Sequence, residues 1–144
     1  MVSWNAESKC ISEASLDAIV ACVESSFPDW NILFLSEAGS IASTSFEVLH
    51  PRYKLIRHWP GPGSRSMCFV VRDPLTSLSL SVSRRNRVLA LEIWCQGSRK
   101  PTSTCICGVH GPHEDIITWH DFCSDFMDLV GSRKFRGPLV MAGD

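Results

Sequence analysis

The sequence lacks the features that mark several large classes of protein. Its seven cysteines are odd in number, include no CxxC pair and lie mostly within apolar runs, so no disulfide framework is indicated. No apolar run approaches the ~18 residues of a membrane span. The N-terminus has neither the basic start nor the cleavage site of a signal peptide. We therefore expect a soluble intracellular protein, cytoplasmic or nuclear, with no membrane partner.

A strong net charge is also absent. The formal net charge is -1 over 144 residues, so no global basic field draws the chain to a polyanion. The basic residues form three short clusters, Arg84-Arg85-x-Arg87, Arg99-Lys100 and Arg133-Lys134-x-Arg136. Such clusters usually belong to solvated loops, and a DNA-backbone contact by the first cluster is the alternative. Any contact with nucleic acid must therefore be local.

The sequence does contain an order of elements typical of an α/β protein, without an internal repeat or a linker. Apolar residues at helical spacing predict helices over 12–27 and 114–130. Short apolar or alternating runs predict strands at 1–4, 31–37, 45–49, 53–58, 66–72, 77–82, 87–94, 103–109 and 139–142. The middle strands read as an antiparallel meander, with "SRRNR" at 83–87 as a hairpin tip. Helices at both ends of this meander predict a mixed sheet.

Four polar residues directly follow apolar strands: Asn5, Glu37, His110 and Asp144. If these strand ends share one edge of a sheet, an amide, two carboxylates and an imidazole converge there. Carboxylate oxygens suit Mg²⁺ or Mn²⁺, and an imidazole can contact a phosphate or move a proton. Taken singly, each residue also has a structural explanation: a turn former, a solvated strand end, a loop histidine and a helix cap.

Five motifs occur in a familiar order: "SWNA", "DWNILFLSEAG", "SMCFVVRD", "ICGVHGPHE" and "GPLVMAGD". In order and spacing they resemble the N-terminal half of the endonuclease/exonuclease/phosphatase superfamily, and most of all the endonuclease domains of non-LTR retrotransposons. The resemblance implies half of a four-layer α/β sandwich, with one mixed sheet and helices on its outer face. It also implies that residues 1–144 stop inside a Gly-Asp-x-Asn motif and lack the C-terminal half.

The resemblance implies a role for each strand-end residue. Asn5 would orient the phosphate and the water, and Glu37 would bind Mg²⁺ or Mn²⁺. His110 would contact the scissile phosphate and act as an acid, and Asp144 of Gly143-Asp144 would activate or orient the attacking water. The implied activity is hydrolysis of phosphodiesters in nucleic acid, with DNA as the partner, inactive or weak in this fragment.

Other readings remain open. The chain could be a non-catalytic relic that binds a partner, or a phosphodiesterase for small molecules or lipids. Zinc at Cys107-x-x-His110-x-x-His113, with Cys105 as a fourth ligand, is disfavoured because Cys105 and Cys107 share one strand face and no helix joins the histidines. A half-sandwich would also leave one apolar sheet face uncovered, so we expect self-association through that face.

Overall fold

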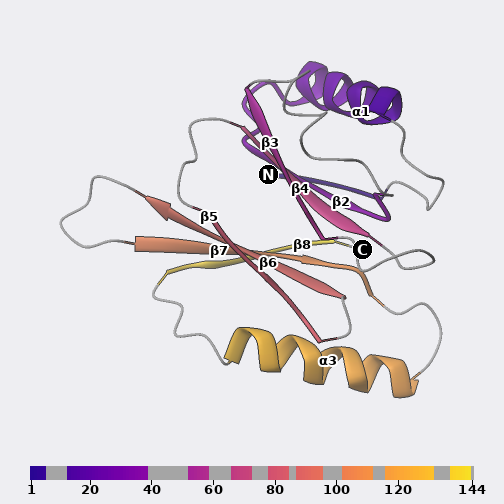
Figure 1. Cartoon of the computed structure of the whole chain (residues 1–144), viewed down its shortest axis with the longest axis vertical. Helices are drawn as coiled ribbons and strands as arrows, with labels where there is room; N and C mark the ends of the chain where they lie inside the picture. Colours follow the sequence, from indigo (N-terminus) through magenta and orange to yellow (C-terminus); the bar gives the residue numbers. More distant parts are fainter. Residues whose placement is uncertain are drawn as a thin grey trace. The chain divides into compact units, whose positions relative to one another are not determined.

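The computed structural model describes residues 1–5, 13–38, 52–58, 66–72, 78–84, 87–95, 102–111, 116–131 and 137–143. These residues form eight strands and two helices, divided between two units, Met1–Pro74 and Leu75–Asp144 (Figure 1). The α/β class with mixed sheets is confirmed, but each unit has its own four-stranded sheet, whereas the sequence predicted one. Pro74 stands between the units in sequence and lacks the backbone N–H that a continuing ladder would need.

The first unit is a four-stranded sheet with one helix. Its elements are β1 (Val2–Asn5), α1 (Glu13–Ser26), β2 (Ile32–Ser36), β3 (Tyr53–His58) and β4 (Met67–Arg72). The strand order is β1-β2-β4-β3, with β1 parallel to β2 and the other pairs antiparallel. Because parallel neighbours need a crossover, α1 connects β1 to β2.

Helix α1 covers one face of this sheet (Figure 1). Its residues Leu16, Val20 and Val23 recur at helical spacing and are buried. They pack in one cluster with Leu33, Leu35, Leu55, Cys68 and Val70 of the strands. The sequence predicted a helix to residue 27, with Phe27 on its apolar face. The helix instead ends at Ser26, before Pro28, and Phe27 is 56% exposed.

Side-chain contacts fasten the end of α1 to β3. The Trp30 ring stacks on Tyr53 at 5.1 Å between centroids, and the Tyr53 hydroxyl donates to a Glu24 carboxylate oxygen. Arg52 lies 3.6 Å from the same carboxylate. These contacts fix the register of helix against sheet at the end where β2 begins.

The second unit repeats this arrangement with a different strand order. Its elements are β5 (Leu78–Val82), β6 (Val88–Cys95), β7 (Thr102–Val109), α3 (Ile116–Gly131) and β8 (Leu139–Gly143). The order is β5-β6-β7-β8, and β8 runs parallel to β7 after the crossover through α3. The predicted strand at 45–49 lies outside the described residues. No described helix is long and apolar enough to cross a membrane.

The core of the second unit lies between α3 and the sheet. Val88, Ala90, Cys105 and Cys107 project from β6 and β7 and are buried. The helix residues that pack on them are Phe122, Phe126, Leu129 and Val130. The apolar spacing in the sequence predicted these four residues of the buried face, but it also included Trp119 and Cys123, which are exposed.

Self-association through an uncovered sheet face, expected from the sequence, stays a prediction. Phe34 and Phe69 in the first unit, and Leu89 and Leu91 in the second, belong to the faces away from the helices and are fully buried. Exposed apolar side chains occur instead along β8, at Leu139, Val140 and Met141. Strand β8 is an edge strand, and an apolar edge is a template for pairing with another chain.

We expect Met141→Lys to reduce self-association. Met141 is 55% exposed on β8, and a lysine there opposes edge pairing because its charge would have to be desolvated. Size-exclusion chromatography with light scattering should show a shift from larger species towards the monomer. Ser79→Lys, an exposed position on β5 at the other edge of the same sheet, is the matched control and should change little. An equal effect of both variants would show that the β8 edge is not the contact.

Candidate active site

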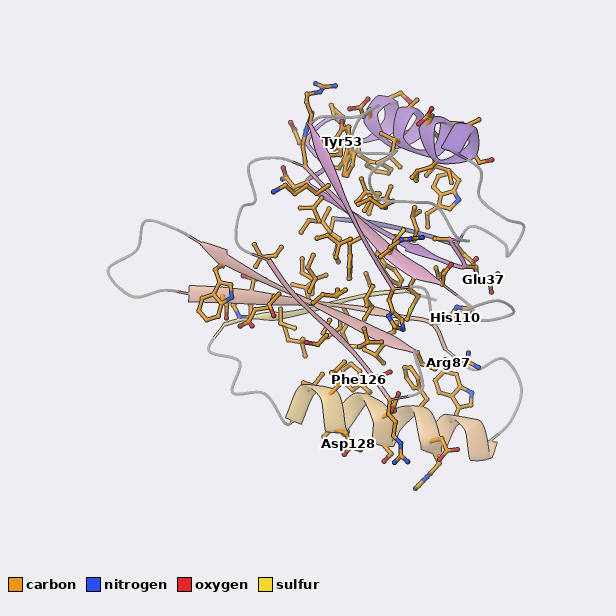
Figure 2. The ribbon with its side chains drawn as sticks, viewed as in Figure 1. Glu37, Tyr53, Arg87, His110, Phe126 and Asp128 are labelled. Carbon is orange, nitrogen blue, oxygen red and sulfur yellow. The ribbon has the colours of Figure 1, made fainter. Side chains whose placement is uncertain are left out.

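Asn5 and Glu37 lie side by side at the carboxyl edge of the first sheet. Asn5 is the last residue of β1 and pairs with Ser36, the last residue of β2. Glu37 follows directly and is only 9% exposed (Figure 2). Because the two strands are parallel, both polar residues arrive at one edge of this sheet. The sequence analysis considered all four strand ends on one sheet, whereas His110 follows a strand of the other sheet.

The backbone of Glu37 is left-handed, with φ 57°. This conformation costs a non-glycine residue about 1–2 kcal/mol. The left-handed residue also interrupts the alternation of side chains between the two faces of the strand. As a result, Ala38 packs in the cluster of Leu33 and Leu35 under α1. Its N–H donates to the Ser66 carbonyl oxygen at 3.0 Å. Strain of this kind gathers at functional sites, so the outlier supports a role for Glu37.

His110 is the corresponding residue of the second sheet. It follows the last residue of β7, is 1% exposed, and its backbone N–H donates to the Arg87 carbonyl oxygen at 3.0 Å. Cys105 and Cys107 face α3, so the alternation of β7 directs position 110 to the other face of the sheet. The imidazole is therefore separated from the two thiols of the same strand.

Asp144 lies outside the described residues, but the residue before it is well defined. Gly143 pairs with Val109, the residue before His110. Its φ of 148° is one that side-chain-bearing residues rarely adopt, and a Cβ at this position would lie 2.0 Å from the Val109 carbonyl oxygen. The glycine of the Gly-Asp pair is thus required by the close approach of β8 to β7.

The buried cysteines of the described residues do not form a zinc site with His110. The Sγ atoms of Cys105 and Cys107 are 3.8 Å apart and buried under α3, away from the His110 face. No cluster of three metal-ligating side chains occurs in the described ranges, and His113 lies outside them. Burial raises the pKa of the Cys68 thiol to about 12, against a smaller lowering by Arg57. Cys68 is therefore protonated at neutral pH.

The oxygen atoms at this edge of the sheet are of the type that binds a hard divalent cation, but they are few. Glu37 supplies a nearly buried carboxylate, and neighbouring Asn5 supplies an amide oxygen. Oxygen ligands of this type suit Mg²⁺ or Mn²⁺, which keep several waters when few protein ligands are available. Within the described residues the site is too sparse for tight binding.

Arg72, which stands in the "VVRD" motif, lies at the opposite end of the sheet. Its N–H donates to the Asn31 carbonyl oxygen at 2.9 Å, and its Nη1 donates to the Pro28 and Trp30 carbonyl oxygens at 2.9 and 3.2 Å. These bonds brace the segment between α1 and β2. Arg72 therefore has a structural role at this end of the sheet.

Sequence reasoning missed the surroundings of His110. The structure places Arg87 opposite His110, and the Arg87 Nη1 donates to the Gly111 carbonyl oxygen at 3.4 Å. The only signal in the sequence was the basic cluster that contains Arg87. The exact register of the β6–β7 pair, which the sequence does not give, was needed to find the contact.

No protein-family profile matches the sequence, and no curated protein is significantly similar to it. Solved structures are similar in fold. An endonuclease/exonuclease/phosphatase family protein from Bacteroides thetaiotaomicron matches with TM-score 0.59 and 12% identity, over 99% of this chain and 62% of its own. The human Nocturnin catalytic domain with bound sulfate anion gives TM-score 0.55 and 15% identity, over 99% and 63%. D. rerio TDP2 complexed with single strand DNA product gives 0.58 and 11%, over 99% and 59%.

These similarities define the class of fold. The chain has an α/β fold shared with proteins of the endonuclease/exonuclease/phosphatase superfamily, in agreement with the resemblance seen in the motifs. At such low identity the similarity concerns the fold alone. The chain spans about 60% of the length of these neighbours. The likeness to retrotransposon endonucleases and the assignment to an N-terminal half remain predictions.

We expect Glu37→Gly to stabilise the fold while weakening metal binding. Glycine adopts φ 57° without a Cβ clash, so the free energy of unfolding should rise by up to about 1 kcal/mol. Thermal and urea unfolding would measure it. Ser36→Gly, one residue earlier in a regular strand, is the control and should destabilise by about 0.5–1 kcal/mol. A loss of stability in Glu37→Gly matching that control would mean that Glu37 is not strained.

Proposed function

We propose that this chain carries part of the active site of a metal-dependent phosphodiesterase that acts on nucleic acid, of the kind found in non-LTR retrotransposon endonucleases. One observation supports it most directly: each parallel strand pair delivers polar residues to its carboxyl edge. In the first unit these are Asn5 and Glu37; in the second it is His110, which follows Val109, the partner of Gly143. Asp144 comes directly after Gly143 in the sequence.

The proposed chemistry assigns one task to each side chain. Glu37 holds Mg²⁺ or Mn²⁺, which when bound supplies Lewis-acid stabilisation of the charge on the phosphate. Asn5 orients the phosphate and the attacking water through its amide. His110 donates a proton or a hydrogen bond to a phosphate oxygen, and Asp144 accepts a proton from the water. These roles follow from the resemblance in the motifs and from the chemistry of each group.

DNA is the proposed substrate. A neighbour in fold, D. rerio TDP2, was solved with a single strand DNA product, which favours nucleic acid over a lipid or a small molecule. The alternative is a relic that binds a partner without catalysis. That alternative is favoured by the small number of possible metal ligands. Among the described residues, Glu37 is the one carboxylate at the carboxyl edge of the first sheet.

Metal binding should be weak and should depend on Glu37. We expect a dissociation constant for Mg²⁺ or Mn²⁺ in the millimolar range, because so few protein oxygens are available. Glu37→Gln should weaken binding at least about tenfold, since it removes the charge. Titration followed by NMR chemical shifts measures both. Asp128→Asn, an exposed carboxylate on α3, is the control. Micromolar affinity that survives Glu37→Gln would contradict the assignment.

Nuclease activity should be no more than a trace. Active-site groups act as a unit, so a partial set loses most of the rate enhancement. We expect slow nicking of supercoiled plasmid with Mn²⁺ that His110→Ala and Glu37→Gln each abolish, as gel electrophoresis would show. Trace nicking that persists in both variants would come from a contaminant and would contradict the proposal. Robust nicking abolished by His110→Ala would instead show that these 144 residues hold a complete site.

A further inference from the structure

The turn between β5 and β6 holds the backbone of Arg87 through a buried serine. The Ser83 Oγ accepts hydrogen bonds from the N–H groups of Arg87 at 3.1 Å and Val88 at 3.0 Å. The Ser83 N–H in turn donates to the Val88 carbonyl oxygen at 2.9 Å. Arg87 therefore enters β6 in a fixed position, whereas Arg84 of the same turn is exposed.

Arg87 in turn contacts the His110 segment twice. Its carbonyl oxygen accepts the His110 N–H at 3.0 Å, and its Nη1 donates to the Gly111 carbonyl oxygen at 3.4 Å. The first bond extends the β6–β7 ladder by one pair beyond Val88 and Val109, so Arg87 and His110 are directly opposite (Figure 2). Arg87 thus binds both the N–H of His110 and the carbonyl oxygen of Gly111.

His110 needs such a restraint because it lies just past the end of β7. A residue at a strand end is held by fewer ladder bonds than one in the middle, and its φ and ψ are correspondingly less restricted. A side chain that acts on a substrate must stay within about 0.5 Å of its working position. The contact from the charged guanidinium to the Gly111 carbonyl oxygen is long, at 3.4 Å, and it adds to the backbone bond at His110.

We propose that Arg87 is a positioning residue that orients the His110 imidazole. Arg87 acts through the backbone of residues 110 and 111, and Ser83 supports it by holding the Arg87 N–H. This inference rests on the proposed function, because it concerns the orientation in which His110 meets a phosphate. A direct contact between Arg87 and phosphate is a different role, which the experiment separates from this one.

The test follows the imidazole resonances of the chain's five histidines by NMR, in the whole chain labelled with ¹⁵N. In Arg87→Ala we expect the His110 ring resonances and the Gly111 amide resonance to shift and broaden. The rings of His58 in the first unit and His120 on α3 should be unchanged. Arg87→Lys should restore the wild-type spectrum only in part, because lysine lacks the planar fork that reaches a carbonyl. Arg84→Ala is the matched control and should have no effect.

A second variant guards against simple unfolding. Ser83→Ala keeps the guanidinium but removes the hydroxyl that holds the Arg87 N–H, so it should shift the same His110 resonances by a smaller amount. If the His110 ring resonances are unchanged in both Arg87→Ala and Ser83→Ala, the inference is overturned. Changes spread evenly over all histidines would also overturn it, since they would indicate general destabilisation.

The dinucleotide thymidylyl-thymidine, added without metal, separates this inference from the function on which it rests. In the wild-type protein it should perturb the His110 ring, and in Arg87→Ala that perturbation should fall by about half or more because the ring is less well ordered. No perturbation in the wild type would contradict the proposed function itself. Weaker dinucleotide binding with an unmoved His110 ring would assign Arg87 to direct phosphate contact and overturn positioning.

Discussion

The parallel pairing of β1 with β2, and of β7 with β8, determines where the candidate site residues lie. Parallel neighbours cannot be joined by a hairpin, so each pair needs a crossover helix, and both strands of a pair end at the same edge. Asn5 pairs with Ser36 next to Glu37, and Val109 next to His110 pairs with Gly143. An antiparallel pairing would have sent the members of each pair to opposite ends of the sheet. The chemistry therefore depends on strand direction before it depends on any side chain.

The two strand ends leave their ladders in different ways. Gly143 has φ 148°, and the carbonyl oxygen of Val109 leaves no room for a Cβ, so glycine there is what local rules predict. Glu37 also has a positive φ but carries a long charged side chain. A residue with positive φ is usually glycine, as at Gly143, but at position 37 it is glutamate. Such departures from local preference are typical of functional sites. The conformation is maintained by the Ala38–Ser66 hydrogen bond and by the burial of Ala38.

Apolar spacing in the sequence predicted the elements well, because each element is selected by the residues of its own segment. The run "ILFLS" predicted β2, and Leu16, Val20 and Val23 predicted the buried face of α1. Apolar spacing failed to predict the features that depend on contacts between distant segments. Division into two sheets depends on which strands pair, and the contact from Arg87 to Gly111 depends on the register of β6 against β7. The sequence contains both segments but not their alignment, and a shift of one residue would move Arg87 to the other face.

The structural explanations of the strand-end residues are weakened by burial. A glutamate that merely closes a strand should be solvated, and a loop histidine should be exposed, because burying a polar or charged group costs free energy unless it is compensated. Glu37 is 9% exposed and His110 is 1% exposed. Burial therefore separates both residues from the solvated positions that the structural explanations require. The thiols of β7 are buried as ordinary core residues under α3. The contrast between the two faces of β7 is why the proposal rests on His110 and on oxygen ligands, not on sulfur.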